Sequence, residues 1–294
     1  MALDLRNIPE DKQTYVMCLE SVNADWEQLQ FVDERYQTEE LYREAIEQNG
    51  FAIQYVKAQT PELCLAAVKR CGLTLRYVKN QTPEICLEAV RRSGSAIQYV
   101  KNQTPETCST AIRRWPFAIG FIKHQTPEMC FEAVRQDGRA LEYVENQTPE
   151  ICLAAIEQSG YALKYVKNQT PEICLAAVKR IGETLECVEE QTLEICLEAV
   201  RQNGMAVQFV KGKIPEICLE AVKQNGIALK YVPRSKQTLP IAIAALRQNP
   251  DSRKFLAVKF RKPEVYKAAG YDYKPEDLAP SRSSTKRERT EPDH

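Results

Sequence analysis

The chain repeats itself with a period of 22 residues. The segment QTPELCLAAVKRCGLTLRYVKN from Gln59 is followed directly by QTPEICLEAVRRSGSAIQYVKN from Gln81. Further copies begin at Gln103, Gln125, Gln147, Gln169 and Gln191, and degenerate ones at Gln13, Gln37, Lys213 and Gln237. That gives eleven units, nine of 22 residues and two of 24. Such a period is typical of proteins in which short modules stack on one another. Positions are numbered below from the first residue of each unit, so Gln81 is position 1 of the fourth unit.

Each regular unit carries the signals of one α-helix. Thr82 can accept hydrogen bonds from the first N–H groups of a helix, Pro83 suits the first helical position, and Glu84 complements the positive helix end. Eight units have glycine at position 14, where the left-handed conformation that ends many helices is accessible. They are Gly50, Gly72, Gly94, Gly138, Gly160, Gly182, Gly204 and Gly226. The pattern therefore predicts an α-helix from position 3 to position 12, closed by the glycine.

The rest of the unit predicts a second, shorter element. In the segment from Ser95 to Val100, apolar side chains stand at positions 16, 17, 19 and 20. Ala-Leu followed by Gln, Lys or Arg favours a short helix, whereas six residues could also form a strand. We therefore predict an all-α solenoid of eleven helix–turn–helix repeats of about 22 residues. The alternative is an α/β solenoid like the leucine-rich repeats.

A stack of such units predicts the organisation of the whole chain. Neither helix can bury its apolar surface alone, so neighbouring units supply the core for each other. We expect an N-terminal lead-in over residues 1–12 and the repeat array over residues 13–258. Residues 259–270 are expected to form a closing helix, and the Pro-, Ser- and charge-rich residues 271–294 a disordered tail.

The recurring motifs resemble one known family. Pro-Glu-Ile-Cys-Leu-Glu-Ala-Val and Gly-x-Ala-Leu-Lys-Tyr-Val, with close variants, recur along residues 13–256, and they are similar to the short repeats of the "domain of unknown function 4116" family. The resemblance implies helical tandem repeats and supplies no functional residues to carry over. The first, second and eleventh units depart from the pattern.

Composition excludes several classes of function. Forty basic residues balance forty acidic ones, so no global field directs the chain to nucleic acid or to acidic membranes. Two histidines, and no Cys-x-x-Cys pair, argue against a metal centre. No phosphate-binding loop, Rossmann glycine pattern or nucleophile elbow is present. We therefore expect no catalysis, no cofactor and no membrane-spanning segment.

The cysteines follow the repeat. Nine of the eleven stand at position 6. Equivalent positions in stacked units lie roughly 10 Å apart, which is too far for a disulfide. We expect buried thiols and a reducing, cytoplasmic location.

The fifth unit departs most from the repeat and supplies the first candidate site. Arg113, Arg114, Trp115, Pro116 and Phe117 replace the usual Arg-Arg-Ser-Gly-Ser. Trp and Arg are enriched at binding hot spots. We expect either a local bend at Pro116 with Trp115 covering the turn, or a recognition patch.

A row of lysines supplies the second candidate. The stretch runs from Lys57 to Lys123 at position 21 of four successive units, with Lys79, Lys101 and Lys123 as the residues to test, and Glu145 interrupts the row. If the second helices of the units line a concave side of the array, this row of lysines suits an acidic partner. The alternative is an ordinary solvated surface row.

These observations favour a non-enzymatic, monomeric scaffold that binds another protein along an extended surface. Nucleic-acid binding through the rows of Lys and Arg, and a purely structural assembly role, remain as alternatives.

Overall fold

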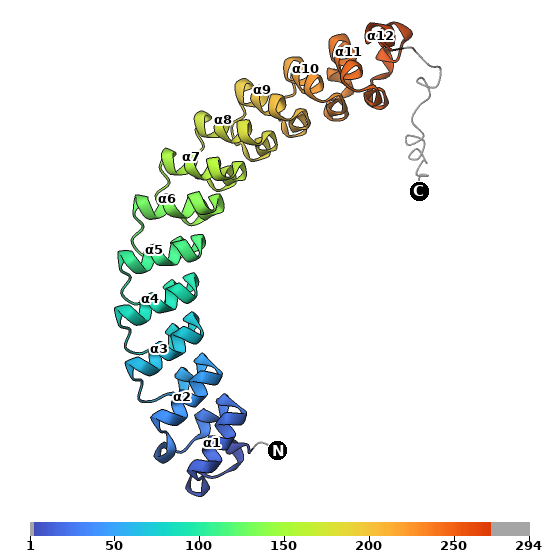
Figure 1. Cartoon of the computed structure of the whole chain (residues 1–294). Coiled ribbons are helices and arrows are strands. Elements are labelled where there is room, and N and C mark those ends of the chain that lie inside the picture. The colour runs from blue at the N-terminus through green and yellow to red at the C-terminus, as the bar shows by residue number, and fades with distance from the viewer. Residues whose placement is uncertain (1–2, 272–294) are drawn as a thin grey trace, which may run out of the picture. The chain divides into compact units, whose positions relative to one another are not determined.

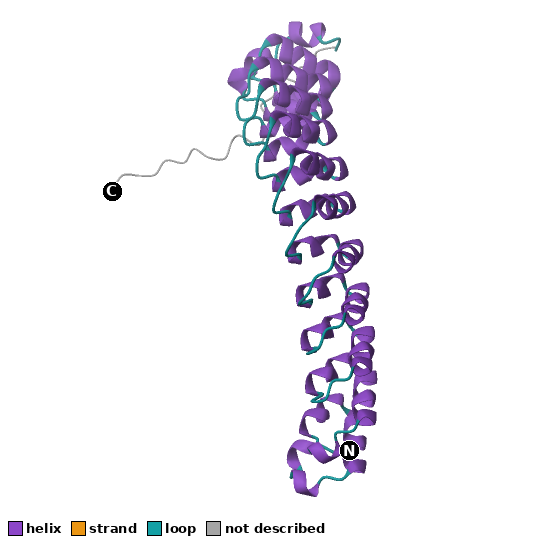
Figure 2. Ribbon diagram, turned by 90° about the vertical axis from the view of Figure 1, so that its left-hand side faces the viewer, coloured by secondary structure: helices purple, strands orange, loops and turns teal. Residues whose placement is uncertain are grey.

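The computed structural model describes residues 3–271, and within that range the secondary structure consists of helices joined by short loops, with no β-strand (Figure 2). The prediction of an all-α repeat array is confirmed, and the leucine-rich-repeat-like alternative is wrong for this part of the chain. The tail predicted for residues 271–294 lies, apart from Tyr271, outside the described residues.

Each unit contains one ten-residue α-helix. The α-helices are α1 (Tyr15–Ala24), α2 (Glu39–Gln48), α3 (Pro61–Arg70), α4 (Pro83–Arg92), α5 (Pro105–Arg114), α6 (Pro127–Gln136), α7 (Pro149–Gln158), α8 (Pro171–Arg180), α9 (Leu193–Gln202), α10 (Pro215–Gln224) and α11 (Leu239–Gln248), followed by the shorter α12 (Pro263–Ala268). The regular helices start at the predicted proline because the preceding threonine caps them. The Thr82 hydroxyl, for example, accepts from the Ile85 N–H at 3.3 Å. Ile214 replaces this threonine before α10, and no side chain caps that helix.

The second element of each unit is a six-residue 3-10 helix, labelled η. The eleven are η3 (Trp26–Phe31), η5 (Gly50–Tyr55), η6 (Gly72–Tyr77), η7 (Gly94–Tyr99), η8 (Pro116–Phe121), η9 (Gly138–Tyr143), η10 (Gly160–Tyr165), η11 (Gly182–Cys187), η12 (Gly204–Phe209), η13 (Gly226–Tyr231) and η15 (Pro250–Phe255). A 3-10 helix is tighter than an α-helix and is used in short pieces. The predicted second helix is therefore present, wound more tightly than an α-helix.

Short 3-10 turns occur where a unit is longer than 22 residues or incomplete. They are η1 (Leu5–Asn7), η2 (Glu10–Lys12), η4 (Glu34–Tyr36), η14 (Arg234–Lys236) and η16 (Val258–Phe260). Two additional residues in a unit thus become one additional turn before the next α-helix. The lead-in contributes Leu5, which is 1% exposed, to the core of the first unit.

The chain divides into two compact bodies, described residues up to Ile151 and from Cys152 onward. Within the first body, successive α-helices lie side by side in chain order, and the 3-10 helices form a second row beside them (Figure 1). Helices α8 to α12 of the second body pack in the same way. Each body is therefore two layers thick.

The core lies between these two layers and between neighbouring units. In the fourth unit, Cys86, Ala89 and Val90 of α4 and Ile97 of η7 are at most 4% exposed. The same positions are buried in the other regular units, whereas Leu87 at position 7 is half-buried. A fully buried Ile or Leu contributes about 2 kcal/mol relative to an exposed one, so most of the stability comes from these rows.

The predicted role of the position 14 glycines is wrong. Among the described residues, the glycine with positive φ is Gly270, whereas the α-helices of the repeats end at an extended residue at position 13, such as Ser93 with φ −145°. The glycine instead begins the 3-10 helix, where the next unit comes very close. A Cβ added to Gly94 would lie 2.7 Å from the Ala111 carbonyl oxygen. Position 14 therefore favours glycine for close packing between units rather than for a left-handed turn.

Candidate functional site

The residues singled out in the fifth unit and in the lysine row all lie in the first body. Trp115 is the extended residue between α5 and η8, and Phe117 is the second residue of η8. Pro116 is the first residue of η8, and α5 and η8 have the same lengths as the corresponding helices of the other units. Pro116 therefore does not shift the ends of these two helices, as a local bend could have done. A proline is tolerated there because its φ suits the first position of a helix.

Four aromatic side chains, named here the Trp115 cluster, come from the residue before η8, from η8 itself and from the end of η9. The Trp115 ring stacks on Phe121 with centroids 5.9 Å apart and contacts Phe117 at the same distance. Phe117 meets Tyr143 of the next unit edge to face at 6.0 Å. Phe121 and Tyr143 are 42% and 44% exposed. The structure thus joins two predicted residues to two that the sequence interpretation did not single out.

A glycine makes room for this cluster. Position 18 carries a longer side chain in neighbouring units, such as Gln98, but it is Gly120 in the fifth unit. A Cβ on Gly120 would lie 2.9 Å from Cδ1 of Tyr143. Trp115 and Gly120 are thus both departures of the fifth unit from the repeat, and both contribute to the same aromatic cluster.

A cation borders the cluster. The Arg139 guanidinium lies over the Phe117 ring, 5.4 Å from its centroid, and its Nη2 is 2.7 Å from the Asp137 carboxylate. Hydrogen bonds from Arg139 lower the pKa of Asp137. A guanidinium over an aromatic face is a favourable arrangement and presents a charge beside the apolar rings.

The two predicted arginines differ in their surroundings. Arg113 points to α6, where its guanidinium lies 3.7 Å from Glu132, and it donates to Thr110 at 3.2 Å. Arg114 is exposed and makes no ion pair or side-chain hydrogen bond with the described residues. Neither arginine makes a cation–π contact with a ring of the Trp115 cluster, where that role belongs to Arg139.

The lysine row, defined as Lys79, Lys101 and Lys123, lies on the loops between each 3-10 helix and the next α-helix. Each Nζ donates to the backbone carbonyl of position 21 one unit earlier. The distances are 3.2 Å from Lys79 to Lys57, 2.8 Å from Lys101 to Lys79 and 3.2 Å from Lys123 to Lys101. The three ammonium groups are therefore held in a line by the backbone of the array.

Sequence interpretation missed the role of the glutamine at position 1, which links successive units. The Gln81 amide donates to the Leu75 carbonyl of the preceding unit at 3.3 Å and to the Tyr99 carbonyl at 2.9 Å, and its oxygen accepts from the Lys101 N–H at 2.9 Å. The signal was present, because ten of the eleven units begin with glutamine. A polar residue just before a helix cap is also typical of a simple turn, so the pattern alone does not indicate a link between units.

The one unit without this glutamine supports the same interpretation. Lys213 stands at position 1 there and donates to the Val210 carbonyl at 2.8 Å, but an ammonium cannot accept a hydrogen bond. Position 21 of that unit is Pro233, which has no N–H to donate. This unit thus lacks both the side-chain acceptor at position 1 and the backbone N–H donor at position 21.

The position 6 cysteines are buried, and the thiol also takes part in this network. The Cys86 Sγ lies 3.8 Å from the Gln81 oxygen, and burial raises the pKa of the Cys86 thiol. No disulfide joins any of the eleven cysteines, all of which lie in the described part of the chain. Within residues 3–271 no group of His, Cys, Asp and Glu is arranged to hold a metal ion. No helix in that range is long and apolar enough to cross a membrane.

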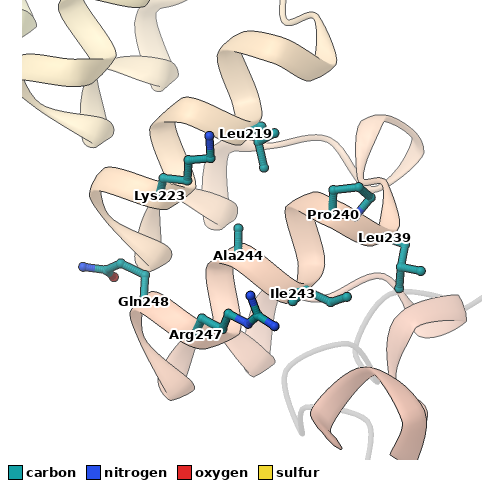
Figure 3. A pocket seen from close by; sticks show the side chains of 8 residues that line it. All are labelled: Leu219, Lys223, Leu239, Pro240, Ile243, Ala244, Arg247 and Gln248. Carbon is teal, nitrogen blue, oxygen red and sulfur yellow. The ribbon is translucent and has the colours of Figure 1, made fainter. Parts of the chain in front are cut away.

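The second body contains a groove that the sequence interpretation did not predict. It lies between α10 and α11, has a volume of about 720 Å³, and is lined by Leu219, Leu239 and Ile243, with Lys223 and Arg247 at its border (Figure 3). Leu239 is 48% exposed. Pro240 and Ala244 stand where α10 has Glu216 and Glu220, which makes the α11 side of the groove apolar.

Comparison with known proteins agrees with the repeat pattern. The model of one family, described as Domain of unknown function (DUF4116), matches residues 60–104, 126–169, 192–235 and 214–261. No curated protein and no solved structure matches the chain. The family matches together span more than half of the chain and coincide with the stacked units, so the protein belongs to the DUF4116 family.

Proposed function

We propose that the protein is a non-enzymatic scaffold that binds a protein partner, with the Trp115 cluster as the principal contact. The observation that carries this proposal is local. One unit of a regular array breaks the repeat at Trp115 and Gly120. These residues add the Trp115 ring to the exposed Phe121 and Tyr143 rings, beside Phe117 and Arg139. A few residues carry most of the binding energy at protein interfaces, and Trp, Tyr and Arg are enriched among them.

The polar side chains that recur through the array support the non-enzymatic part of the proposal. Glutamine at position 1, threonine at position 2 and lysine at position 21 each bond to the backbone, as Gln81, Thr82 and Lys101 do. The repeated chemistry is therefore that of a framework. Absence of disulfides despite eleven cysteines supports a cytoplasmic, reducing location.

The test is a quantitative affinity purification with the Trp115→Ala chain and a matched control. Trp26, the other tryptophan, is also half-buried, lies in η3 and contacts Tyr55 at 6.0 Å, so Trp26→Ala removes a similar side chain elsewhere. We expect Trp115→Ala to weaken recovery of specific partners at least tenfold and Trp26→Ala to leave recovery unchanged.

A second variant separates binding from folding. Phe121 and Tyr143 are exposed, so Phe121→Ser/Tyr143→Ser should leave the helical circular dichroism unchanged while removing the apolar contact. Partners recovered equally by wild type and by both cluster variants would show that the cluster is not the binding site.

A further inference from the structure

The lysine row is a line of cations that no carboxylate neutralises. Among the described residues, none of Lys79, Lys101 and Lys123 forms an ion pair with a carboxylate. One unit earlier, Lys57 at the same position is paired with Glu34. One unit later, Glu145 occupies the position. The positive stretch therefore covers three units and is bounded at both ends.

The row is also fixed in place before any partner arrives. Each ammonium donates one hydrogen bond to a carbonyl of the preceding unit, which leaves two N–H donors on each nitrogen. A lysine side chain normally loses substantial rotamer entropy when it is immobilised in a complex. The intramolecular bonds have already restricted these side chains, so less entropy is lost on binding.

Amide groups lie beside the ammonium groups. A pocket of about 380 Å³ lies between the loops of two units and is lined by Lys79 and Lys101 together with Asn80 and Asn102. Both asparagines are exposed, and neither side chain bonds to another described residue. Each amide offers donors and an acceptor, which suits the backbone groups of an extended peptide.

The spacing of the row selects one peptide conformation. Neighbouring helices pack about 8–10 Å apart, so the lysines recur at about that interval. A polyproline II helix advances about 9.3 Å per turn of three residues, and every third side chain lies on the same edge. A β-strand alternates its side chains between two faces, so every third residue would point away. The polyproline II backbone also has no internal hydrogen bonds and can pair with Asn80 and Asn102.

We propose that the lysine row binds an acidic peptide segment in the polyproline II conformation, with one carboxylate for each of three successive repeats. The partner is a protein rather than a nucleic acid for two reasons. No aromatic side chain lines the pocket to stack on bases. A longer phosphate backbone that continued along the same edge would meet Glu145.

The test uses a fluorescent peptide of about twelve residues built from Glu-Pro-Ala, with fluorescence anisotropy as the readout. The comparison peptide has the same composition but carries its glutamates at every second residue. We expect the Glu-Pro-Ala peptide to bind at least about tenfold more tightly, and its affinity to fall as salt rises from about 50 mM to about 300 mM.

Variants of matched charge locate the site. Lys79→Glu/Lys101→Glu/Lys123→Glu should reduce the affinity at least about tenfold, because three attractive contacts become repulsive. Lys69→Glu/Lys179→Glu/Lys223→Glu changes the net charge equally, at position 11 of three units, and should leave the affinity within about twofold after correction for salt. Because charge reversal also removes the bonds to the carbonyls, both variants are first compared by thermal unfolding. If the row variant alone is unstable, Lys79→Gln/Lys101→Gln/Lys123→Gln replaces it and should weaken binding in the same direction.

Three results would overturn the proposal. They are equal binding of the two peptides, equal loss of affinity in both charge variants, and displacement of the peptide by a single-stranded oligonucleotide at lower concentration than by unlabelled peptide. Trp115 is not among the residues that line the pocket beside Lys79 and Lys101. Trp115→Ala should therefore leave peptide binding unchanged, which keeps this test separate from that of the Trp115 cluster.

Discussion

At the scale of the residue, the glycines of position 14 and the buried cysteines show how closely the units pack. An added methyl group at most of these glycines would contact a backbone carbonyl oxygen of the following unit, and backbone cannot move aside as a side chain can. The cysteines fill the adjacent layer, where a thiol is small enough for the core and still reaches the glutamine oxygen.

Two glycines of the ninth unit test this packing. A Cβ on Gly204 would clash with the Ala221 carbonyl oxygen, whereas a Cβ on Gly212 would meet nothing within 4 Å. We expect Gly204→Ala to lower the free energy of unfolding by about 2 kcal/mol and Gly212→Ala to leave it unchanged or slightly raised. Urea unfolding followed by circular dichroism measures both. Equal effects of the two substitutions would contradict the packing role.

The thiols predict how stability depends on pH. Burial raises the pKa of eight position 6 thiols, Cys18, Cys64, Cys86, Cys108, Cys130, Cys174, Cys196 and Cys218. The unfolded chain releases these protons first, above a pH of about 8.5. Their contribution to stability is therefore complete at neutral pH and is lost as the pH rises through the folded-state pKa values. We expect the urea midpoint to fall between pH 7 and pH 10, and an unchanged midpoint would contradict the buried, protonated thiols.

At the scale of the element, glutamine at position 1 connects what would otherwise be separate helices. Gln81 bonds to the preceding unit, to the end of η7 and to the loop that follows it. Loss of such a side chain leaves partly buried backbone groups without partners, which costs more than the loss of an exposed hydrogen bond.

The matched pair for this prediction lies in one unit. Gln81→Ala should lower the free energy of unfolding by about 2 kcal/mol. Gln98→Ala removes an exposed glutamine that donates only to Ser95, and it should cost less than about 0.5 kcal/mol. Thermal or urea unfolding distinguishes them, and a loss for Gln98→Ala as large as for Gln81→Ala would show that the link between units is not the cause.

The sequence allowed one of the two elements to be predicted in detail. The α-helix could be delimited because Thr82, Pro83 and Glu84 are local signals whose effect does not depend on other units. The winding of η7 could not, because buried Ala96, Ile97 and Val100 fit an α-helix or a 3-10 helix equally well. The roles of Gly94 and Gln81, and the bonds of the lysine row, depend on the register between units, which no single unit carries. The same holds for the Trp115 cluster, in which Tyr143 comes from the following unit.

At the scale of the whole molecule, stability is shared between neighbours. Each described unit buries its apolar side chains against adjacent units of its body, and the regular units join through the same groups. Arrays of this kind behave as a sum of unit stabilities and interface terms. An internal unit should therefore be exchangeable with a copy of its neighbour.

The most direct test of this account is to insert a second copy of residues 81–102 after residue 102 and to measure urea unfolding by circular dichroism. The copy meets the fifth unit as the original does now, and the original meets the copy through the same repeat positions that join the third and fourth units. The copy therefore gains a full set of contacts with its neighbours. The free energy of unfolding and its dependence on urea should both rise, because one more unit and one more interface are buried. A chain that loses helical signal, or that unfolds at lower urea with no increase in urea dependence, would contradict the account.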